Sequence, residues 1–453
     1  MSAPLRIVVV AHGWPPQEHA GAELAAAWLA RGLVERGHAV RAFVRTGWPD
    51  LPLLATVRER VDGVAVTRIK TLPEQATSLR GTYLDPGVRA AFERELADGV
   101  DVVHFHHTLG LSIDLVEAAR QAGARVVFTL HDFWHLCPRG QRYTPSGHLC
   151  AEIEPDRCAR CIGKKRARYA LQRFAREPGR ALLGLPRYLA ENLGTLAIRR
   201  RSAEMLAAVG RADVVTAPSQ FVLDEHRRQG LHAPSAVVVA NGIAAEVAEA
   251  LRPREAPGAP LRFGFVGSLL PSKGADLLLT AFRGLVEGGR AAGASGGGTA
   301  GTAHDAATTC ATLAIHGTSP WDGGAYARRL EEQHRHPAIR FHGRFGREQL
   351  ADVLGSIDVL VVPSRWYENA PITLDEAALA RLPVVVAGHG GMAELLAARG
   401  NGLAFRPGDA ADLQAALARF LREPGLWQAL RTPRVPIPTA AAIAAQFESL
   451  YRA

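Results

Sequence analysis

The sequence predicts an α/β protein made of two doubly wound domains, each with a parallel sheet covered on both faces. Short Val-rich runs alternate with segments of helical pattern, and this alternation starts again after the Pro-rich stretch LRPREAPGAP. The length, 453 residues, also exceeds what one ordinary core holds. We therefore expect a first domain over residues 1–250, a second over 251–438, a cleft between them, and a final helix within 439–453.

The first domain is expected to begin with a βαβ unit. Ile7–Val10 is predicted as a buried strand, Gly21–Arg36 as a helix closed by Gly37, and Ala39–Val44 as the next strand. Continuous Val-rich runs suit a parallel sheet buried on both faces. Four more such runs predict further strands: Val102–His106, Arg125–Leu130, Val214–Ala217 and Val237–Ala240.

A linker is expected at Ala244–Pro260, before the second alternation. Its predicted elements are a helix from about Gly274 and the strands Leu261–Val266, Leu313–His316, Ile339–His342, Val359–Val362 and Val384–Ala387. The Gly-, Ala- and Thr-rich segment 287–312 cannot repay the entropy of ordering, so a flexible insertion is expected there. Thr439–Arg452 has a helical pattern, but periodicity does not place it in the fold.

Composition and charge limit the location and partners of the chain. No apolar run approaches the roughly 18 residues that span a bilayer, and the N-terminus lacks the pattern of a signal peptide. A cytoplasmic protein is therefore expected. Lys and Arg outnumber Asp and Glu by nine, and many cluster in Lys164–Arg201 among aromatic and Leu positions. This basic segment predicts either a surface that lies on anionic lipid or a solvated helix pair. No nucleic-acid-binding motif is recognisable.

Two glutamates lie eight positions apart around a proline, in the stretch SRWYENAPITLDE that ends at Glu376. On one helix they would point about 80° apart. Proline is favoured at the first helical position, so with Pro371 near that position Glu368 precedes the helix and Glu376 lies a turn or more inside it. The free N–H groups between them form an anion site suited to pyrophosphate. The alternative is that both carboxylates are simply solvated.

Other polar residues follow predicted strands at the same edge. The loop GSLLPSKG after Leu261–Val266 brings Lys273 near a helix start, where it can neutralise phosphate. Gly21 suits close approach of the backbone to a ligand, although an ordinary tight turn explains it nearly as well. His131 follows Arg125–Leu130, at the edge where open sheets bind ligands. Together these features predict a phosphate- and sugar-binding site in the cleft.

The Glu368/Glu376 pair, the VGSLLPSKG loop and the TLHDFWHLCPRG run from Thr129 resemble motifs of the family-four retaining glycosyltransferases with the GT-B fold. The resemblance extends from Ile7 to Tyr451. It implies two Rossmann-like domains that face a cleft. The donor, expected to be a UDP- or GDP-sugar, would be held mainly by the second domain and the acceptor mainly by the first. The C-terminal helix would cross back to brace the first domain.

The resemblance also implies roles for residues. Glu376 would bind the ribose, and Glu368 would contact hydroxyls of the transferred sugar and help to stabilise the transition state. Lys273 would contact the phosphates, and His131 would lie near the sugar. Backbone groups would make the remaining contacts to the nucleotide sugar. The pyrophosphate would be held by the backbone of Asn369, Ala370, Pro371, Ile372 and Thr373, and the base would be contacted by the backbone around Arg344 and Phe345.

The sequence departs from the family pattern at two places. Ser268 stands where many relatives carry Arg, so one phosphate contact is lost or supplied elsewhere, with Arg344 as a candidate. After Glu368 the usual glycine-rich segment is Asn-Ala-Pro-Ile, and Pro371 removes a backbone donor. Both departures affect the expected phosphate contacts and leave the class unchanged.

Retention at the anomeric carbon without a clear enzymic nucleophile suggests front-face attack. The leaving phosphate would take the proton of the acceptor hydroxyl, and an oxocarbenium-like state would be stabilised electrostatically. Lys273 and the helix N-terminus would then do what a metal does in other folds. Because no Asp-x-Asp motif occurs in a suitable loop, no catalytic metal is predicted.

Four cysteines, Cys137, Cys150, Cys158 and Cys161, follow the pattern C-x12-C-x7-C-x2-C. In a reduced compartment such a cluster favours a structural zinc ion over disulfides. The alternative is a set of small buried hydrophobic side chains. Cys310, in the expected insertion, is predicted to be free.

Three histidines occur in the run VVHFHH. His104 and His106 alternate along a strand and therefore share a face of the sheet. For these two and His107, packing at the sheet end and hydrogen bonding to the acceptor are favoured over metal binding.

The chain is thus predicted to be a retaining glycosyltransferase that acts on a saccharide or a lipid-linked saccharide in the synthesis of a surface polysaccharide or glycolipid. It would work in the cytoplasm, either free or at the inner face of the membrane. A nucleotide-sugar epimerase and a non-catalytic nucleotide-sugar binder are the alternatives on the same scaffold. The residues do not identify the base, the sugar or the acceptor.

Overall fold

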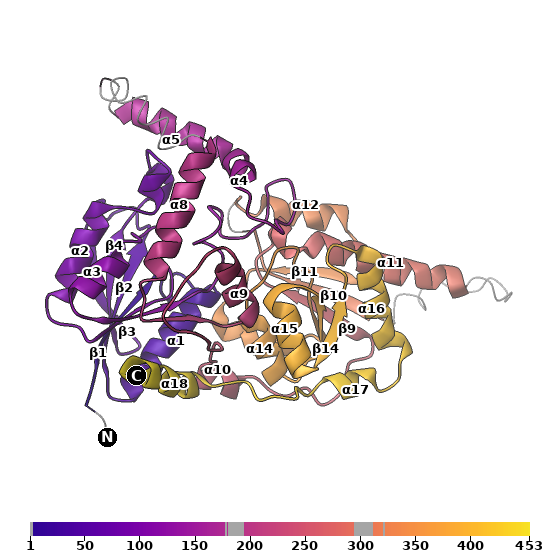
Figure 1. The fold of residues 1–453 in the computed structure, drawn as a ribbon. Coiled ribbons are helices and arrows are strands. Elements are labelled where there is room, and N and C mark those ends of the chain that lie inside the picture. The colour runs from indigo at the N-terminus through magenta and orange to yellow at the C-terminus, as the bar shows by residue number, and fades with distance from the viewer. Residues whose placement is uncertain (1–2, 177–178, 180–193, 294–310, 320–321) are drawn as a thin grey trace. The chain divides into compact units, whose positions relative to one another are not determined.

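The computed structural model describes residues 3–176, 179, 194–293, 311–319 and 322–453. The chain forms two compact units (Figure 1): unit 1 contains Met1–Ala244 and Pro438–Ala453, and unit 2 contains Ala245–Ile437. Each unit has its own mainly parallel sheet with helices, so the predicted fold class is confirmed. In the part of the chain that is described, no helix is long and apolar enough to cross a bilayer.

Unit 1 contains an eight-stranded sheet in the order β3-β4-β2-β1-β5-β6-β7-β8. Its strands are β1 Arg6–Ala11, β2 Ala39–Thr46, β3 Thr56–Val61, β4 Val64–Lys70, β5 Val102–Phe105, β6 Arg125–Thr129, β7 Val214–Ala217 and β8 Ala236–Val238. Strand β3 pairs antiparallel with β4, and the other described pairings are parallel. Its helices are α1 Gly21–Glu35, α2 Pro86–Leu96, α3 Leu115–Gln121, α4 Pro155–Cys161, α5 Gly163–Arg176, α8 Gly194–Val209, α9 Gln220–Arg228 and α18 Ala440–Arg452.

Unit 2 contains a parallel six-stranded sheet in the order β11-β10-β9-β12-β13-β14. Its strands are β9 Leu261–Val266, β10 Ala311–His316, β11 Ile339–Gly343, β12 Val359–Val362, β13 Val384–Ala387 and β14 Gly402–Phe405. Its helices are α10 Ala245–Ala250, α11 Ala275–Gly293, α12 Ala325–Gln333, α13 Leu350–Gly355, α14 Ile372–Leu379, α15 Gly390–Arg399, α16 Ala410–Arg422 and α17 Leu426–Leu430. Counted along the unit, the strand order is 3-2-1-4-5-6, the doubly wound arrangement of dinucleotide-binding folds.

Strands β3, β4 and β14 were not predicted from the sequence. In β3, half-buried and exposed residues alternate, because this antiparallel edge strand is not covered on both faces. In β14 the first three residues are exposed or half-buried and only Phe405 is buried. Both strands therefore lack the continuous Val-rich run that identifies a central parallel strand.

Two segments expected to be irregular are partly regular. The expected linker at Ala244–Pro260 contains α10, whose sequence AEVAEA is rich in strong helix formers. The expected insertion 287–312 begins inside α11, which continues to Gly293, and it ends in β10, where Ala311 pairs with Leu261 of β9. For β10, composition alone missed the end because pairing with β9 extends the strand. The middle of the segment lies outside the described residues.

The C-terminal helix α18 is part of unit 1 and packs beside α1 (Figure 1). A Cβ added at Gly32 of α1 would lie 3.0 Å from the Cβ of Ala444, so glycine permits this close approach. The apolar face of α18 includes the buried side chains of Phe447 and Tyr451. Arg36 also pairs with Glu448 at 2.5 Å. Residues from the two ends of the chain thus form one core.

We predict that Phe447→Ala destabilises unit 1 by about 3–5 kcal/mol, because it leaves a cavity beside His104, whose ring centroid lies 4.7 Å from that of Phe447. Urea unfolding of the intact chain measures this loss. Gln446→Ala, on the exposed face of the same helix, is the control and should change stability by less than about 0.5 kcal/mol. Equal losses in both variants would show that α18 does not complete the core of unit 1.

Candidate functional site

The strand order of unit 2 reverses between β9 and β12, and the loops after these two strands meet there. The backbone N–H of Arg365 donates to the carbonyl of Ser272 at 2.8 Å. Gly274 has φ 71°, and a Cβ at this position would lie 2.0 Å from the carbonyl oxygen of Pro363. Glycine is therefore required both by the left-handed backbone and by the contact between the loops. Ligands of doubly wound sheets bind at such a reversal.

Glu368, in the loop after β12, accepts three hydrogen bonds on one carboxylate oxygen. The donors are Nζ of Lys273 at 2.5 Å, Oγ of Ser364 at 2.7 Å and the indole N–H of Trp366 at 2.7 Å. Only 6% of Glu368 is exposed, so its charge requires such partners. Lys273 also lies over the Trp366 ring, 5.2 Å from its centroid. The sequence indicated Glu368 and Lys273 but not Trp366, although it is only two residues from Glu368.

The helix after this loop, α14, begins one residue later than expected. Pro371 occupies the N-cap position, with φ −61° and ψ 122°, and Ile372 is the first helical residue. The N-cap residue Pro371 makes no side-chain hydrogen bond to the first turn, because proline has no polar side chain. Asn369 is buried, whereas Ala370 and Thr373 are half-buried. The stretch predicted to hold pyrophosphate therefore lies at a helix start, as proposed from the sequence.

Glu376 lies in the second turn of α14 and is 1% exposed. Its Oε1 accepts from Nη1 of Arg347 at 2.6 Å. Burial raises the pKa of Glu376, whereas Arg347 lowers it. The sequence did not indicate Arg347, which lies in a 3-10 turn, Arg347–Gln349, and precedes Glu376 by 29 residues. Only the fold brings these two residues together.

The remaining predicted donor residues lie at the ends of other strands in unit 2. Ser268 is exposed, two residues after β9. Arg344 is exposed and directly follows β11, and the half-buried Phe345 ring lies 6.3 Å from the ring of His316. The loop after β13 also reaches the site, because Nε2 of His389 is 3.0 Å from the carbonyl oxygen of Ser364. His389 was not predicted from the sequence.

Unit 1 has a separate group of polar residues at the carboxyl ends of β1, β5 and β6. Gly21 is exposed and is the first residue of α1. The ring of His12, after β1, lies 4.2 Å from the ring of His107, after β5. His131 and Asp132 follow β6, and both are half-buried. The predicted residues Gly21 and His131 thus lie in unit 1, whereas Glu368 lies in unit 2.

Two of these histidines are paired with carboxylates. His12 contacts Glu23 of α1 at 2.9 Å, and His107 contacts Asp132 at 3.2 Å. Burial alone would raise the pKa of Glu23, but His12 and further hydrogen bonds lower it to about 2. Asp132 is affected in the same way by His107, and its pKa is also well below the ordinary value. Both carboxylates are therefore charged at neutral pH.

A row of buried histidines runs behind this group. Nδ1 of His106 lies 2.9 Å from Nε2 of His131, and the rings of His104 and His106 lie 4.2 Å apart. Nδ1 of His104 lies 2.7 Å from the hydroxyl of Tyr451 in α18. His104 and His106 share a face of the sheet, as alternation along β5 predicts. The row links the C-terminal helix to His131.

The four clustered cysteines form no disulfide. Cys137 is buried in the loop after β6, and Cys158 and Cys161 belong to α4. Burial, together with the charges that Cys137, Cys150 and Cys161 would carry, raises the pKa of Cys158 to about 12. Among the described residues, no three His, Cys, Asp or Glu side chains are arranged to hold a metal ion. Zinc stays a prediction.

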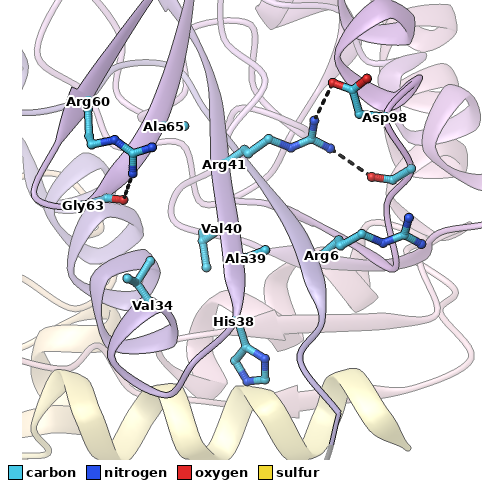
Figure 2. Close-up of a pocket in the computed structure, with 11 residues that line it drawn as sticks. Arg6, Val34, His38, Ala39, Val40, Arg41, Arg60, Gly63, Ala65 and Asp98 are labelled. Atoms are coloured by element: carbon cyan, nitrogen blue, oxygen red, sulfur yellow. Dashed lines mark hydrogen bonds and ion pairs between the residues drawn. The ribbon is translucent and has the colours of Figure 1, made fainter.

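A pocket of about 480 Å³ lies at the opposite, amino end of β1 and β2 (Figure 2). Its cations already have partners in the protein: Arg41 contacts Asp98 and the carbonyl of Gly99, and Arg60 donates to the carbonyl of Gly63 at 2.8 Å. Arg6 pairs with Asp101, outside the lining of the pocket. We therefore assign no ligand to this pocket.

Comparison with known families shows which class of protein combines these two units. Residues 19–247 match the model of "Glycosyltransferase Family 4", and residues 247–432 match that of "Glycosyl transferases group 1". The first match covers 229 of the 453 residues (247 − 19 + 1), about half of the chain. The chain belongs to a GT-B glycosyltransferase family, and it is therefore an enzyme of the glycosyltransferase class.

Solved structures with the same fold cover nearly the whole chain. The sucrose-phosphate synthase of Thermosynechococcus elongatus is 18% identical, with TM-score 0.66, and the match covers 99% of this chain and 98% of that one. Anabaena Alr3699/HepE in complex with UDP and glucose is 16% identical, with TM-score 0.61 and coverage of 99% and 100%. A trehalose-phosphate synthase of Burkholderia xenovorans in complex with glucose-6-phosphate is 15% identical, with TM-score 0.63 and coverage of 99% and 100%. No curated protein sequence matches the chain.

Proposed function

We propose that the chain is a retaining glycosyltransferase that moves a sugar from a nucleotide-sugar donor to a hydroxyl of a saccharide or lipid-linked saccharide. Its product would enter a cell-surface polysaccharide or a glycolipid. One observation carries the proposal. At the strand reversal of unit 2, two buried carboxylates flank the start of α14, and each is held by a cation, Glu368 by Lys273 and Glu376 by Arg347.

The donor would bind along this row of groups in unit 2. The ribose hydroxyls would donate to Glu376 and replace the guanidinium of Arg347. The pyrophosphate would accept hydrogen bonds from the uncapped N-terminus of α14, and Lys273 would neutralise part of its charge. Glu368 would then accept from hydroxyls of the transferred sugar. When ligand hydroxyls replace the internal cation, each buried carboxylate still accepts hydrogen bonds, so its charge is never left without a partner.

The transfer step would break the bond from the anomeric carbon to the leaving phosphate oxygen and form the bond to the acceptor oxygen on the same face. The proton of the acceptor hydroxyl would move to the leaving phosphate. Glu368 would stabilise the positive charge that develops on the sugar, and Lys273 the negative charge on the phosphate. His131 of unit 1 would donate a hydrogen bond to the sugar.

UDP-sugars are the first donors to test, because Alr3699/HepE, which shares the fold, has been solved with UDP-glucose. GDP-sugars are the second choice. The charged Glu23 and Asp132 in unit 1 are hydrogen-bond acceptors, which suits the hydroxyls of a saccharide acceptor.

The basic segment supports a further proposal, that the enzyme acts at an anionic membrane face. Lys164–Arg201 contains eleven Lys or Arg residues against two Glu residues. Large apolar side chains are also exposed there: Leu171 and Leu196 are 75% and 67% exposed, and Phe174 is 36% exposed. Apolar and basic residues combined on helices α5 and α8 are suited to a bilayer surface with anionic lipids.

The first prediction from this function concerns Glu368→Gln, which removes the charge but keeps the shape. We expect the transfer rate to fall by about 100-fold or more, because the charge is needed mainly in the transition state. UDP affinity, measured by calorimetry, should change by less than about threefold. Thermal-shift screening with UDP-, GDP-, ADP- and TDP-sugars first identifies the donor.

Matched variants separate the roles of the two glutamates. Glu376→Gln should weaken nucleotide binding by about tenfold or more, because a buried acceptor of ribose hydroxyls is altered. Glu348→Gln changes an exposed residue of the same unit and should leave the transfer rate and the nucleotide affinity unchanged. A normal transfer rate in Glu368→Gln would contradict the assigned role, and an inverted anomer in the product would contradict retention.

The membrane proposal predicts that the enzyme sediments with vesicles that contain about 30% phosphatidylglycerol but not with neutral phosphatidylcholine vesicles. The double variant Leu171→Glu, Phe174→Glu should lose most of this binding. Leu53→Glu, at an equally apolar site that is 56% exposed, is the control and should bind normally. Equal binding of all three proteins would exclude this surface.

The zinc hypothesis predicts about one zinc ion per chain in metal analysis of protein purified under reducing conditions. Cys158→Ser and Cys161→Ser should lose the metal, because a site closed by four thiolates loses one ligand. Cys310→Ser should retain it. A wild-type chain that folds without zinc and takes up none on addition would refute the hypothesis.

A further inference from the structure

The buried side chain of His106 connects the core of unit 1 to His131. Its Nδ1 lies 2.9 Å from Nε2 of His131, and the two rings are nearly parallel, with an interplanar angle of 17°. His106 is 3% exposed. A contact at this distance between two ring nitrogens requires that one of them donates a proton and the other accepts it.

Both imidazoles are neutral at pH 7. Burial lowers the pKa of His106 well below its ordinary value, with a further lowering by His104 and His131. Burial also lowers the pKa of His131, as does the nearby His107. A neutral imidazole carries one N–H and one bare nitrogen, so only two arrangements of the pair exist. Either His106 donates from Nδ1, or His131 donates from Nε2.

The other nitrogen of His106 distinguishes these two arrangements. Nε2 of His106 is buried and has no hydrogen-bond partner among the described residues. If His131 donated, His106 would carry its proton on Nε2, and this N–H would be buried without an acceptor. If His106 donates, only a bare nitrogen is left unpaired. Orphaned buried N–H groups are rarer than under-satisfied acceptors in native proteins, so the second arrangement is favoured.

The surrounding structure holds His106 in place for this bond. Its backbone N–H donates to the carbonyl of Val10 at 2.8 Å, which fixes the end of β5 on β1. Its ring lies beside that of His104, at 4.2 Å. His104 is fixed in turn, by the hydroxyls of Tyr451 and Thr129, each at 2.7 Å. The position of His106 therefore does not depend on a bound ligand.

We propose that His106 is a positioning residue, which donates from Nδ1 to Nε2 of His131 and thereby fixes His131 as the tautomer that carries its proton on Nδ1. The Nδ1–H of His131 is then a neutral donor with a fixed direction. The consequence for catalysis rests on the proposed function, in which His131 donates to a hydroxyl of the transferred sugar. The tautomer itself does not depend on that function.

The tautomer can be measured by NMR on the full chain with ¹⁵N-labelled histidine. The signals of His131 are identified by their loss in His131→Gln. In the wild type at pH 7 we expect a protonated Nδ1 and a bare Nε2. In His106→Leu, which removes the donor, we expect a mixture of both tautomers. His106→Asn places an amide N–H near the former Nδ1 and should restore the wild-type signature.

Activity provides the second readout. His106→Leu should lower kcat of transfer by about tenfold, while UDP affinity stays within about threefold, because the nucleotide contacts lie in unit 2. His106→Asn should recover most of the rate. His38→Leu removes another buried histidine of unit 1, 7% exposed, and should change neither the tautomer nor the rate.

Two outcomes would overturn the proposal. One is a wild-type His131 that carries its proton on Nε2. The other is a His131 tautomer that stays the same in folded His106→Leu. If the tautomers follow the prediction but no variant or wild-type chain transfers sugar, the proposed function fails and the positioning role of His106 stands.

Discussion

All carboxyl ends of parallel strands meet at one edge of a sheet, and the arrangement of polar residues in both units depends on this constraint. In unit 2 it brings together loops that follow β9, β12 and β13, which are far apart in the sequence. The contact of Gly274 with the carbonyl of Pro363 keeps the first two loops close. In unit 1 the same constraint collects the histidines and carboxylates after β1, β5 and β6.

Burial of charge then determines what each group can do. Glu368 and Glu376 are both removed from water, so each requires a donor, and Lys273 and Arg347 supply it. In the proposed function, ligand hydroxyls replace one internal donor while each carboxylate stays paired. Asp375 of α14 is also buried and paired with a cation, the buried Arg399. Burial raises the pKa of Asp375 to about 6. Unlike Glu368 and Glu376, it has no described ion pair with a residue of a strand-end loop.

The buried histidine row of unit 1 differs from the carboxylate–cation pairs of unit 2 in being neutral. Burial keeps the pKa of His104 at about 3 and that of His131 low, so the histidine row carries no charge at pH 7. Its hydrogen bonds fix directions and tautomers instead. The C-terminal helix contributes directly, because Tyr451 bonds to His104 and Phe447 packs against its ring. Helix α18 therefore helps to hold His131, which follows β6, through His104 and His106.

The sequence by itself determined the fold class and most central strands, and it indicated Glu368, Glu376 and Lys273 as candidate site residues, because Val-rich runs and strand-end motifs are local patterns. It did not determine the edge strands β3 and β14, which lack a continuous apolar run, or the exact start of α14 at Ile372. The partners Arg347 and Trp366 and the contact between His106 and His131 were decided only by the tertiary structure. Each depends on which strand ends become neighbours, and long-range pairing leaves no periodic signal in the chain.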